Sequence, residues 1–350
     1  MKPYQLTGLT AEIANRIGII VYRNSPGHTE AAALAVMSSM TGCRYYVTPP
    51  GRPYNAQDPL TYKAPIVQRN FILIDQAPSL ADDTCSAAEM VMRDAGDHNV
   101  QRHSMSPSEA WHRSYREPGF LLLMPYASLD QLTKLDPLEY GKADASAKVL
   151  DALQRSKDTG EARFPHLVIK PKNAPDILPP SAHTILAAVK RHDLKRNLSE
   201  YSSGGMLGYR AVYAPAGKTV TNPQPETRLM NTELAKRISK FTYARRTFIP
   251  PITVKWNVVA AAIFTDFKTK LGCRDMERPF LPDWVELSEQ IIDIAALLAI
   301  GDNADAPIIA EVNILAAIHI AMRGYWSYTR LLARNSPSVL SKARPYRRFG

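Results

Sequence analysis

Short apolar runs separated by polar segments fill the first half of the chain. The first of these runs is 17–22. After it and a short polar loop, an alanine-rich helix is expected to start at Thr29, and a second helix is expected from about Thr84 to Arg93. Strands that alternate with helices are typical of an α/β fold with a parallel sheet. The runs themselves predict strands over 17–22, 43–48, 70–75, 119–125 and 166–171.

From about residue 229 the pattern changes to longer amphipathic or buried stretches, which are typical of helices. Such helices are expected over 232–246, 255–271, 286–300 and 310–332. A stretch rich in Gly and Pro, 202–225, separates the two halves. We therefore predict an α/β core over 1–210, a linker over 211–228, a helical lid domain over 229–332 and a basic tail over 333–350.

The composition is that of a globular protein. The chain has 350 residues, of which 45% are hydrophobic, and this fraction is too high for a disordered protein. No apolar run reaches the roughly 20 residues that cross a bilayer. The three cysteines form neither a disulfide framework nor a CxxC metal motif. These features predict a soluble intracellular protein with no membrane contact and no metal site.

The positive charge is concentrated in two segments. The formal net charge of the chain is +10. Residues 176–255 hold 13 basic and 5 acidic side chains, a net of +8, and the tail 333–350 holds 5 basic side chains and no acidic one. Clustered Lys and Arg are typical of binding to a phosphate backbone, although a solvated helix face has the same composition.

One candidate for nucleotide chemistry is the segment Tyr22–Thr29. A strand, a loop ending in Gly-His-Thr and a helix form the setting of a phosphate-binding P-loop. Gly27 and Thr29 have the residue types of that motif. His28 stands at the position of its lysine, and Tyr22 at that of its first glycine. A neutral imidazole is a poor substitute for Lys, so a loop that binds no ligand is the competing interpretation.

A second candidate is the end of the run FILID at 71–75. Asp75 follows a buried strand, where a carboxylate can hold Mg²⁺. Gln76 stands next, where an acidic side chain would orient the attacking water. An amide binds water but cannot accept its proton. The competing interpretation of Asp75 is a polar residue that simply ends a strand.

The order of these pieces resembles the AAA+ domain of the minichromosome maintenance (MCM) helicase family. The resemblance covers most of residues 16–320. The matching stretches are 74–95 (IDQAPSLADDTCSAAEMVMRDA), 120–125 (FLLLMP), 161–176 (EARFPHLVIKPKNAPD), 234–253 (LAKRISKFTYARRTFIPPIT) and 286–318 (ELSEQIIDIAALLAIGDNADAPIIAEVNILAAI). The resemblance implies an AAA+ P-loop core of αβα type with a C-terminal all-helical lid. The family's N-terminal DNA-binding domain has no counterpart in these stretches.

The chain departs from that family at the positions that carry its chemistry. By this resemblance His28 replaces the P-loop lysine, Gln76 the Walker B glutamate, Met124 the sensor 1 asparagine and Glu286 the sensor 2 arginine. Only Arg163 keeps its type, as an arginine finger that acts on the nucleotide of a neighbouring subunit. Such groups supply most of the rate of phosphoryl transfer. The resemblance therefore implies a site that needs no ATP or Mg²⁺ cofactor and does not hydrolyse ATP.

Basic side chains are the candidates for contact with DNA. Arg102 lies near the place of the family's DNA-binding hairpin. The helix expected over 232–246 is rich in basic residues and is equally well interpreted as a solvated surface. Its candidates are Lys236, Arg237, Lys240, Arg245 and Arg246.

Together these features predict a catalytically inactive MCM-like subunit, structural or regulatory, in DNA replication or recombination. The resemblance implies a nuclear location, an oligomer or hetero-complex with MCM-type or other replication or recombination proteins, and contact with DNA. Two alternatives remain open. One is an active ATPase with a non-standard P-loop, and the other is a basic nucleic-acid-associated scaffold or viral assembly protein.

Overall fold

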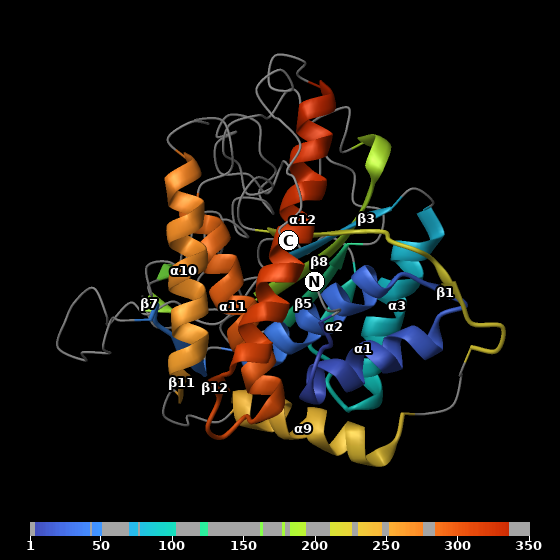
Figure 1. Ribbon diagram of the computed structural model, residues 1–350. Coiled ribbons are helices and arrows are strands. Elements are labelled where there is room, and N and C mark those ends of the chain that lie inside the picture. Colours follow the sequence, from blue (N-terminus) through green and yellow to red (C-terminus); the bar gives the residue numbers. More distant parts are fainter. Residues whose placement is uncertain are drawn as a thin grey trace.

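The structure is a computed structural model, and it describes residues 4–42, 44–50, 70–75, 78–102, 120–124, 162–163, 177–178, 183–193, 211–225, 230–246, 252–275 and 284–335. Its helices are α1 (Gly8–Ile20), α2 (Pro26–Thr41), α3 (Pro78–Asp94), α9 (Thr232–Arg246), α10 (Val258–Asp275), α11 (Trp284–Asp302) and α12 (Glu311–Asn335) (Figure 1). Its strands are β1 (Arg23–Asn24), β2 (Tyr45–Val47), β3 (Asn70–Asp75), β4 (Val100–Arg102), β5 (Phe120–Met124), β6 (Ala162–Arg163), β7 (Ile177–Leu178), β8 (His183–Lys190), β9 (Ala211–Pro215), β10 (Val220–Thr221), β11 (Ile252–Trp256) and β12 (Ile308–Ile309).

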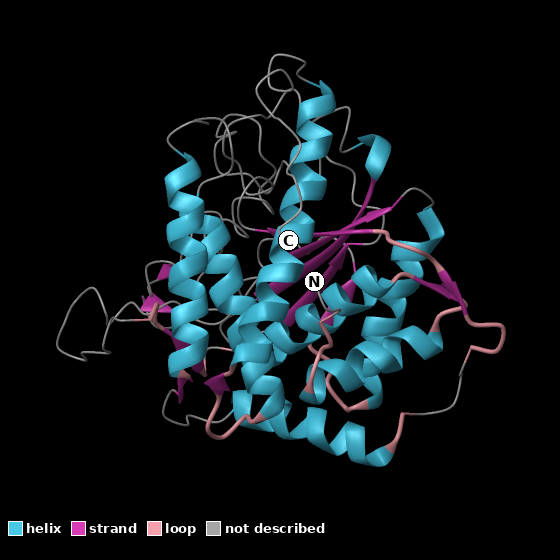
Figure 2. Ribbon diagram, viewed as in Figure 1, coloured by secondary structure: helices cyan, strands magenta, loops and turns pink. Residues whose placement is uncertain are grey.

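The predicted α/β class is confirmed, because a parallel sheet of five strands lies at the centre with helices around it (Figure 2). The strand order is β4-β5-β8-β3-β9, and every neighbouring pair is parallel. β3 pairs with β8 on one side, where Asp75 lies opposite Lys190, and with β9 on the other, where Ile74 lies opposite Pro215. The carboxyl ends of these three strands therefore lie at one edge of the sheet.

Every residue of β3 and β5 is buried. The runs NFILID and FLLLM are apolar without alternation, which is typical of strands covered on both faces. The buried Asn70 at the start of β3 is satisfied because its Oδ1 accepts a hydrogen bond from Ile185 N at 2.9 Å. The strands predicted over 70–75 and 119–125 are confirmed.

Helix α2 is buried nearly all round, and it packs against α1, α3 and the strands β3 and β8. Pro26 at its first position is preset for a helical turn, and small residues such as Ala31–Ala33 let its neighbours approach closely. A helix that is apolar on all sides belongs in a core. The predicted helix after Thr84 is also confirmed, as part of α3, which begins earlier at Pro78.

The strand predicted over 17–22 is wrong, because α1 covers this run as far as Ile20. Short β-branched runs are compatible with a strand or with a buried helix. The helical signal is the buried series Leu9, Ile13 and Ile17, in which the spacing of four residues places the side chains on one face. The strand before α2 is only Arg23–Asn24, and it pairs with β10 instead of joining the central sheet.

The five-stranded sheet contains three strands that no prediction above includes, β4, β8 and β9. β9 and β10 occupy part of the segment 211–228, which we predicted as a linker, so part of that segment belongs to the fold. The strand predicted over 43–48 exists as β2 but pairs with β11, outside the five-stranded sheet. The strand predicted over 166–171 lies outside the described residues.

The four predicted C-terminal helices are confirmed as α9–α12. They do not stand apart from the α/β part, because α11 packs against α1 and α2, and α12 runs along β9. A small parallel sheet of order β12-β11-β2 also joins the two parts. One cluster of buried side chains extends from Leu9 to Tyr325. The helical segment is thus continuous with the core.

The open edge of the sheet at β9 is covered by helices. Ala216 N donates to Ile74 O at 2.9 Å, so the alternate carbonyls of Ala211, Tyr213 and Pro215 point away from β3. Gln290 Nε2 of α11 donates to Ala211 O at 3.3 Å. Gly324 of α12 lies so close to Tyr213 that a β-carbon would be 2.3 Å from its carbonyl oxygen. A glycine at this point lets α12 cover the edge.

None of the helices in the described part of the chain has both the length and the apolar character needed to span a membrane.

Candidate functional site at the carboxyl edge of the sheet

The strand order reverses around β3. From β3 the chain runs to β4 at the far edge, returns through β5 and β8, and then crosses β3 to reach β9. In open parallel sheets, ligands bind outside the carboxyl ends of the strands at such a reversal. The candidate site is therefore the region where β3 and β9 end, which we call the carboxyl-edge site; its residues are Ser25, Gly27, His28, Asp75, Gly217 and Arg323.

Helix α2 begins directly at this edge. Ser25 precedes the helix in extended conformation, but its side chain does not cap α2. Its Oγ instead accepts a hydrogen bond from Gly217 N, just after β9, at 2.8 Å. A β-carbon on Gly27 would lie 3.0 Å from Pro215 O. The first turn of α2 is thus held tightly against the end of β9.

The His28 side chain is fully buried at the end of β3. Its Nε2 lies 3.2 Å from Ile74 O, the same carbonyl oxygen that accepts from Ala216 N. Burial lowers the pKa of His28, and the nearby charge of Asp75 only partly opposes this effect. The imidazole is therefore neutral at pH 7. Its Nδ1 is buried and has no partner among the described residues.

Asp75 ends β3 and caps the helix that follows. Its Oδ2 accepts a hydrogen bond from Ala81 N, in the first turn of α3, at 3.0 Å. A carboxylate is stabilised there by the unpaired amide groups and the positive end of the helix dipole. The place at the start of α3 where an anionic ligand would bind is occupied by a side chain of the chain itself.

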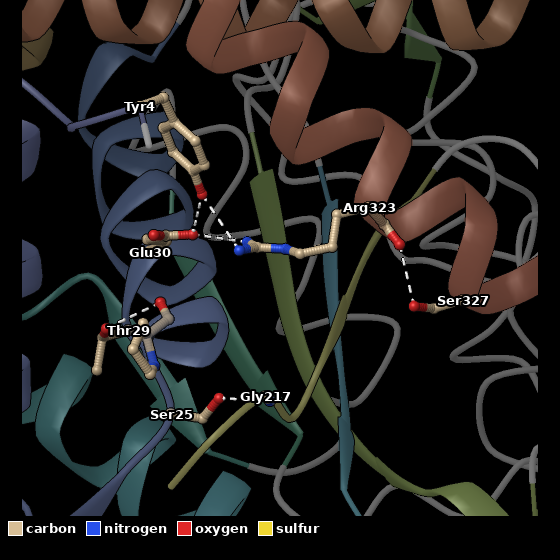
Figure 3. A network of polar contacts seen from close by, with 8 residues as sticks. Tyr4, Ser25, Thr29, Glu30, Gly217, Arg323 and Ser327 are labelled. Atoms are coloured by element: carbon tan, nitrogen blue, oxygen red, sulfur yellow. Dashed lines mark hydrogen bonds and ion pairs between the residues drawn. The ribbon is translucent and has the colours of Figure 1, made fainter. Parts of the chain in front are cut away.

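A polar cluster joins α12 to the start of α2 (Figure 3). Arg323 Nη2 donates to Glu30 Oε2 at 2.6 Å, and Arg323 Nη1 donates to the Tyr4 hydroxyl at 3.1 Å. The Tyr4 hydroxyl donates to the same Glu30 oxygen at 2.6 Å. Burial opposes the charge of Arg323, but Glu30 and Tyr4 outweigh that effect and raise the pKa of the guanidinium. Arg323 is thus a permanent cation beside Gly27, where a β-carbon would lie 3.5 Å from its Cζ.

The predicted nucleotide residues are only partly brought together. Gly27, His28 and Thr29 lie in the first turn of α2, and the imidazole of His28 faces the end of β3 that carries Asp75. Thr29 Oγ1 is used locally, since it donates to Pro26 O at 3.0 Å. Met124 is buried at the end of β5, which β8 separates from β3. Gln76 lies outside the described residues.

Two further predicted residues lie in described elements whose side chains the structure does not describe at these positions. Arg163 belongs to β6, which pairs with β7 in a separate two-stranded sheet. Glu286 belongs to the first turn of α11. The structure therefore gives no contact of either side chain with the carboxyl-edge site.

No protein-family model matches the chain. No curated protein is significantly similar to it either. The described residues also hold no group of three His, Cys, Asp or Glu side chains placed to bind a metal ion.

Most of the predicted DNA-binding side chains that the structure describes contact acidic groups of the same chain. Arg102 Nε donates to Glu89 Oε2 at 2.5 Å, Arg237 pairs with Glu12, and Lys240 Nζ lies 3.0 Å from Asp305 Oδ2. Lys236 is exposed on α9. Arg245 and Arg246 end the same helix, and their side chains are not described. Two basic side chains of α9 thus form ion pairs that attach this helix to α1 and to the loop after α11.

Several residues in or beside the carboxyl-edge site are absent from the predictions. Tyr4, Glu30 and Arg323 belong to no motif, because 293 residues separate the last two and only the fold brings them together. Gly217 and Lys218 do have a sequence signal. They begin Gly-Lys-Thr at 217–219, the residues that end a phosphate-binding P-loop, directly after a strand.

Proposed function

We propose that the chain is a catalytically inactive AAA+-type protein, similar to the MCM family, that acts as a structural or regulatory subunit in DNA replication or recombination. It associates with MCM-type or related partners in the nucleus, and it contributes contacts instead of ATP hydrolysis. The support is the order of the five stretches along the chain and the topology of the sheet, which gives the stretch 74–95 a different role from the one that the resemblance implies. The chemistry at the end of β3 supports the inactive site.

The topology supports the AAA+ part of this proposal. Numbered in chain order, β3, β4, β5, β8 and β9 are strands 1 to 5 of the sheet, and they lie in the order 5-1-4-3-2. AAA+ cores have this strand order. Because proteins of one fold carry out different functions, the chemistry at the end of β3 decides which activity the chain can have.

In this order β3 takes the place of the strand before the P-loop, and not that of the strand that holds Mg²⁺. The relevant segment is therefore 75–82, not Tyr22–Thr29. A P-loop needs glycines that let the backbone wrap the phosphates and a lysine that reaches them. The segment reads DQAPSLAD and has neither. Only Gln76 and Ala77 separate β3 from α3.

The observation that carries the proposal is the hydrogen bond from Ala81 N to Asp75 Oδ2, 3.0 Å long. In an active enzyme the start of this helix would bind phosphate. Here a carboxylate holds that place, so the phosphates of ATP would meet a negative charge and would lose the amide donor. Together with the missing lysine, this contact removes the main sources of electrostatic stabilisation for phosphoryl transfer.

ATP turnover by the purified full-length chain tests this proposal. We expect no Mg²⁺-dependent hydrolysis above background, in the native chain or in Asp75→Ala. Hydrolysis by the native chain that Asp75→Ala abolishes would instead establish the active ATPase with a non-standard P-loop. Lys268→Ala, a change at an exposed position on α10, serves as the control for preparation artefacts.

The partner role is tested by co-purification from cells, followed by ATPase assays of the recovered complex. We expect an ATPase of the AAA+ class in the complex. If Arg163 acts in trans, Arg163→Ala lowers the turnover of that partner by at least about a hundredfold. Arg93→Ala, which removes an exposed arginine of α3, leaves it unchanged. Recovery of the chain without any ATPase contradicts the proposal.

The charge distribution favours a second candidate, a basic scaffold that binds nucleic acid. Residues 176–255 have a net charge of +8, from 13 basic and 5 acidic side chains. Binding of this kind releases counterions, so the affinity for DNA falls steeply as salt concentration rises. DNA binding with a steep salt slope and no recovered ATPase partner favours this candidate over the first.

A further inference from the structure

Five of the nine large apolar side chains that are exposed in the described part of the chain lie at one place, where β11 and β12 end and α10 and α12 begin (Figure 1). Their exposed fractions are between 42% and 85%. We call this group the α10–α12 face; its residues are Val258, Val259, Ile308, Val312 and Leu315. Single exposed apolar residues are normal on a protein surface, whereas a group of this kind marks a contact with another surface.

The pairing of β11 with β12 brings the five residues together. Asn257 N, directly before α10, donates to Ile309 O at 3.0 Å. Val258 and Ile308 therefore lie next to the two ends of one hydrogen bond. Beyond this point α10 and α12 pack against each other, and the two exposed residues of α12, three positions apart, share one side of that helix. The face is thus one part of the surface, although two segments far apart in the chain build it.

The size of the face suits a contact between proteins. The largest apolar patch on a typical monomer covers about 300–600 Å² and often has a function. Five large side chains, each at least 42% exposed, give an area of that order. One side of a standard interface covers about 800 Å², of which a little more than half is apolar. The face therefore supplies most of the apolar area that one partner contributes to such an interface.

Two charged side chains of opposite sign border the face. Lys255 lies opposite Ile308 in the pairing of β11 with β12, so these two side chains are on the same side of that small sheet. Glu311 begins α12 and is next to Val312. Both charged side chains are exposed, and neither forms an ion pair or a hydrogen bond with another described residue. A border with one charge of each sign matches a surface of the same kind better than a strongly acidic or basic one.

We propose that a second copy of the chain covers the α10–α12 face, in a dimer with two-fold symmetry. In such a contact both copies use the same surface, and each pair of residues meets twice. Lys255 of one copy then lies beside Glu311 of the second copy, and the reverse pair forms on the other side of the axis. The apolar side chains meet between the two pairs. This inference does not rest on the proposed function, because it concerns the surface of the helical segment and not the chemistry at the end of β3.

The molar mass of the full-length chain in solution tests this inference. We expect sedimentation equilibrium to show a change from a monomer of 38.9 kDa to a dimer of twice that mass as the protein concentration rises from about 1 to about 100 µM. Association should stop at the dimer, because a two-fold contact uses the same face on both copies. A native chain that stays monomeric over this range overturns the inference, and the face then belongs to a contact with a different protein.

Val258→Asp should weaken the association by about tenfold or more, because it places a charge within an apolar contact. The fold should be retained, since Val258 is 85% exposed and an acidic residue is favoured in the first turn of a helix. An unchanged Tm of the monomer verifies this. Val220→Asp, at a position on β10 that is 48% exposed, is the matched control and should associate like the native chain. Equal association of Val258→Asp and the native chain overturns the inference.

Charge reversal tests whether the partner is a second copy. Lys255→Glu and Glu311→Lys should each weaken the association by about tenfold or more, because like charges then face each other across the axis. A mixture of the two variants should recover the dimer, since both pairs in the mixed dimer again join a lysine to a glutamate. Lys268→Glu, at another exposed position on α10, should associate like the native chain. A mixture that stays monomeric overturns the two-fold arrangement. None of these results bears on hydrolysis at Asp75, so the two proposals fail separately.

Discussion

Glu30 near the start of α2 and Arg323 in the middle of α12 form an ion pair whose nearest oxygen and nitrogen are 2.6 Å apart. Their side chains are 17% and 28% exposed, so the pair is partly shielded from water. The contact links the most deeply buried helix with the last helix of the described chain. It fixes both helices beside the carboxyl edge of the sheet.

We expect Arg323→Met to lower the free energy of unfolding by about 2 kcal/mol, because Glu30 would remain partly buried without its cation. Denaturant titration measures this change. Lys270→Met removes the pair with Asp266, in which both side chains are 62% exposed, and should cost less than about 0.5 kcal/mol. Equal losses in the two variants would show that the Arg323 pair is no stronger than a surface contact.

Tyr4→Phe should lower the free energy of unfolding by about 1 kcal/mol, because the hydroxyl lies between Glu30 and Arg323 and one hydrogen bond to each is lost. The ring itself keeps its contact with His319, where the ring centroids are 4.4 Å apart. Tyr22→Phe, at an exposed ring, is the matched control and should leave the stability unchanged. A similar effect of both changes would argue against the hydrogen-bonded role of Tyr4.

Gly324→Ala should destabilise the fold by about 2 kcal/mol or more, because the new methyl group meets the backbone of β9, which cannot move without breaking its pairing with β3. Gly18→Ala in α1 is the control. Its nearest atom would be 3.6 Å away, and alanine is the better helix former, so this variant should be neutral or more stable by about 0.5 kcal/mol. The denaturant concentration at the midpoint of unfolding should decrease for Gly324→Ala and stay the same or increase slightly for Gly18→Ala. A stable Gly324→Ala variant would mean that α12 does not approach β9 this closely.

The free energy of unfolding should decrease as the pH decreases, because of His28. Burial lowers its pKa in the fold, so the unfolded chain, with a pKa near 6.5, binds more protons as the pH decreases. The free energy of unfolding should therefore decrease as the pH falls below about 6.5, and the loss continues toward the lower pKa of the folded state. Burial lowers the pKa of His319 as well, so this residue contributes in the same direction.

His28→Gln isolates the first contribution, because glutamine cannot take up a proton in this range. We expect its unfolding free energy to depend less on pH between about 7 and 5 than that of the native chain. His319→Gln should leave the contribution of His28 in place. The attribution to His28 is wrong if His28→Gln and the native chain have the same slope.

The sequence identifies the elements whose local pattern agrees with their final environment. NFILID and FLLLM are mostly apolar and become β3 and β5, and the longer amphipathic or buried stretches after residue 229 become α9–α12. The run Ile17–Tyr22 fails because β-branched residues occur in buried helices as well as in strands. β8 and β9 were not predicted, because HTILAAVK and AVYAP contain several alanines, and alanine has a low propensity for β-strands. Neighbouring strands supply their hydrogen bonds.

The candidate site follows the same division. The sequence predicts His28 and Asp75 as residues of interest, and both lie at the carboxyl edge. It does not predict that Asp75 caps α3, that Gly217 bonds to Ser25, or that Arg323 reaches Glu30, because these contacts join segments far apart in the chain. Residue types and local periodicity thus determined the fold class and most helices. The strand order, and with it the meeting of these side chains, was decided only by tertiary packing, since long-range burial and hydrogen bonding select among the many arrangements that the local patterns allow.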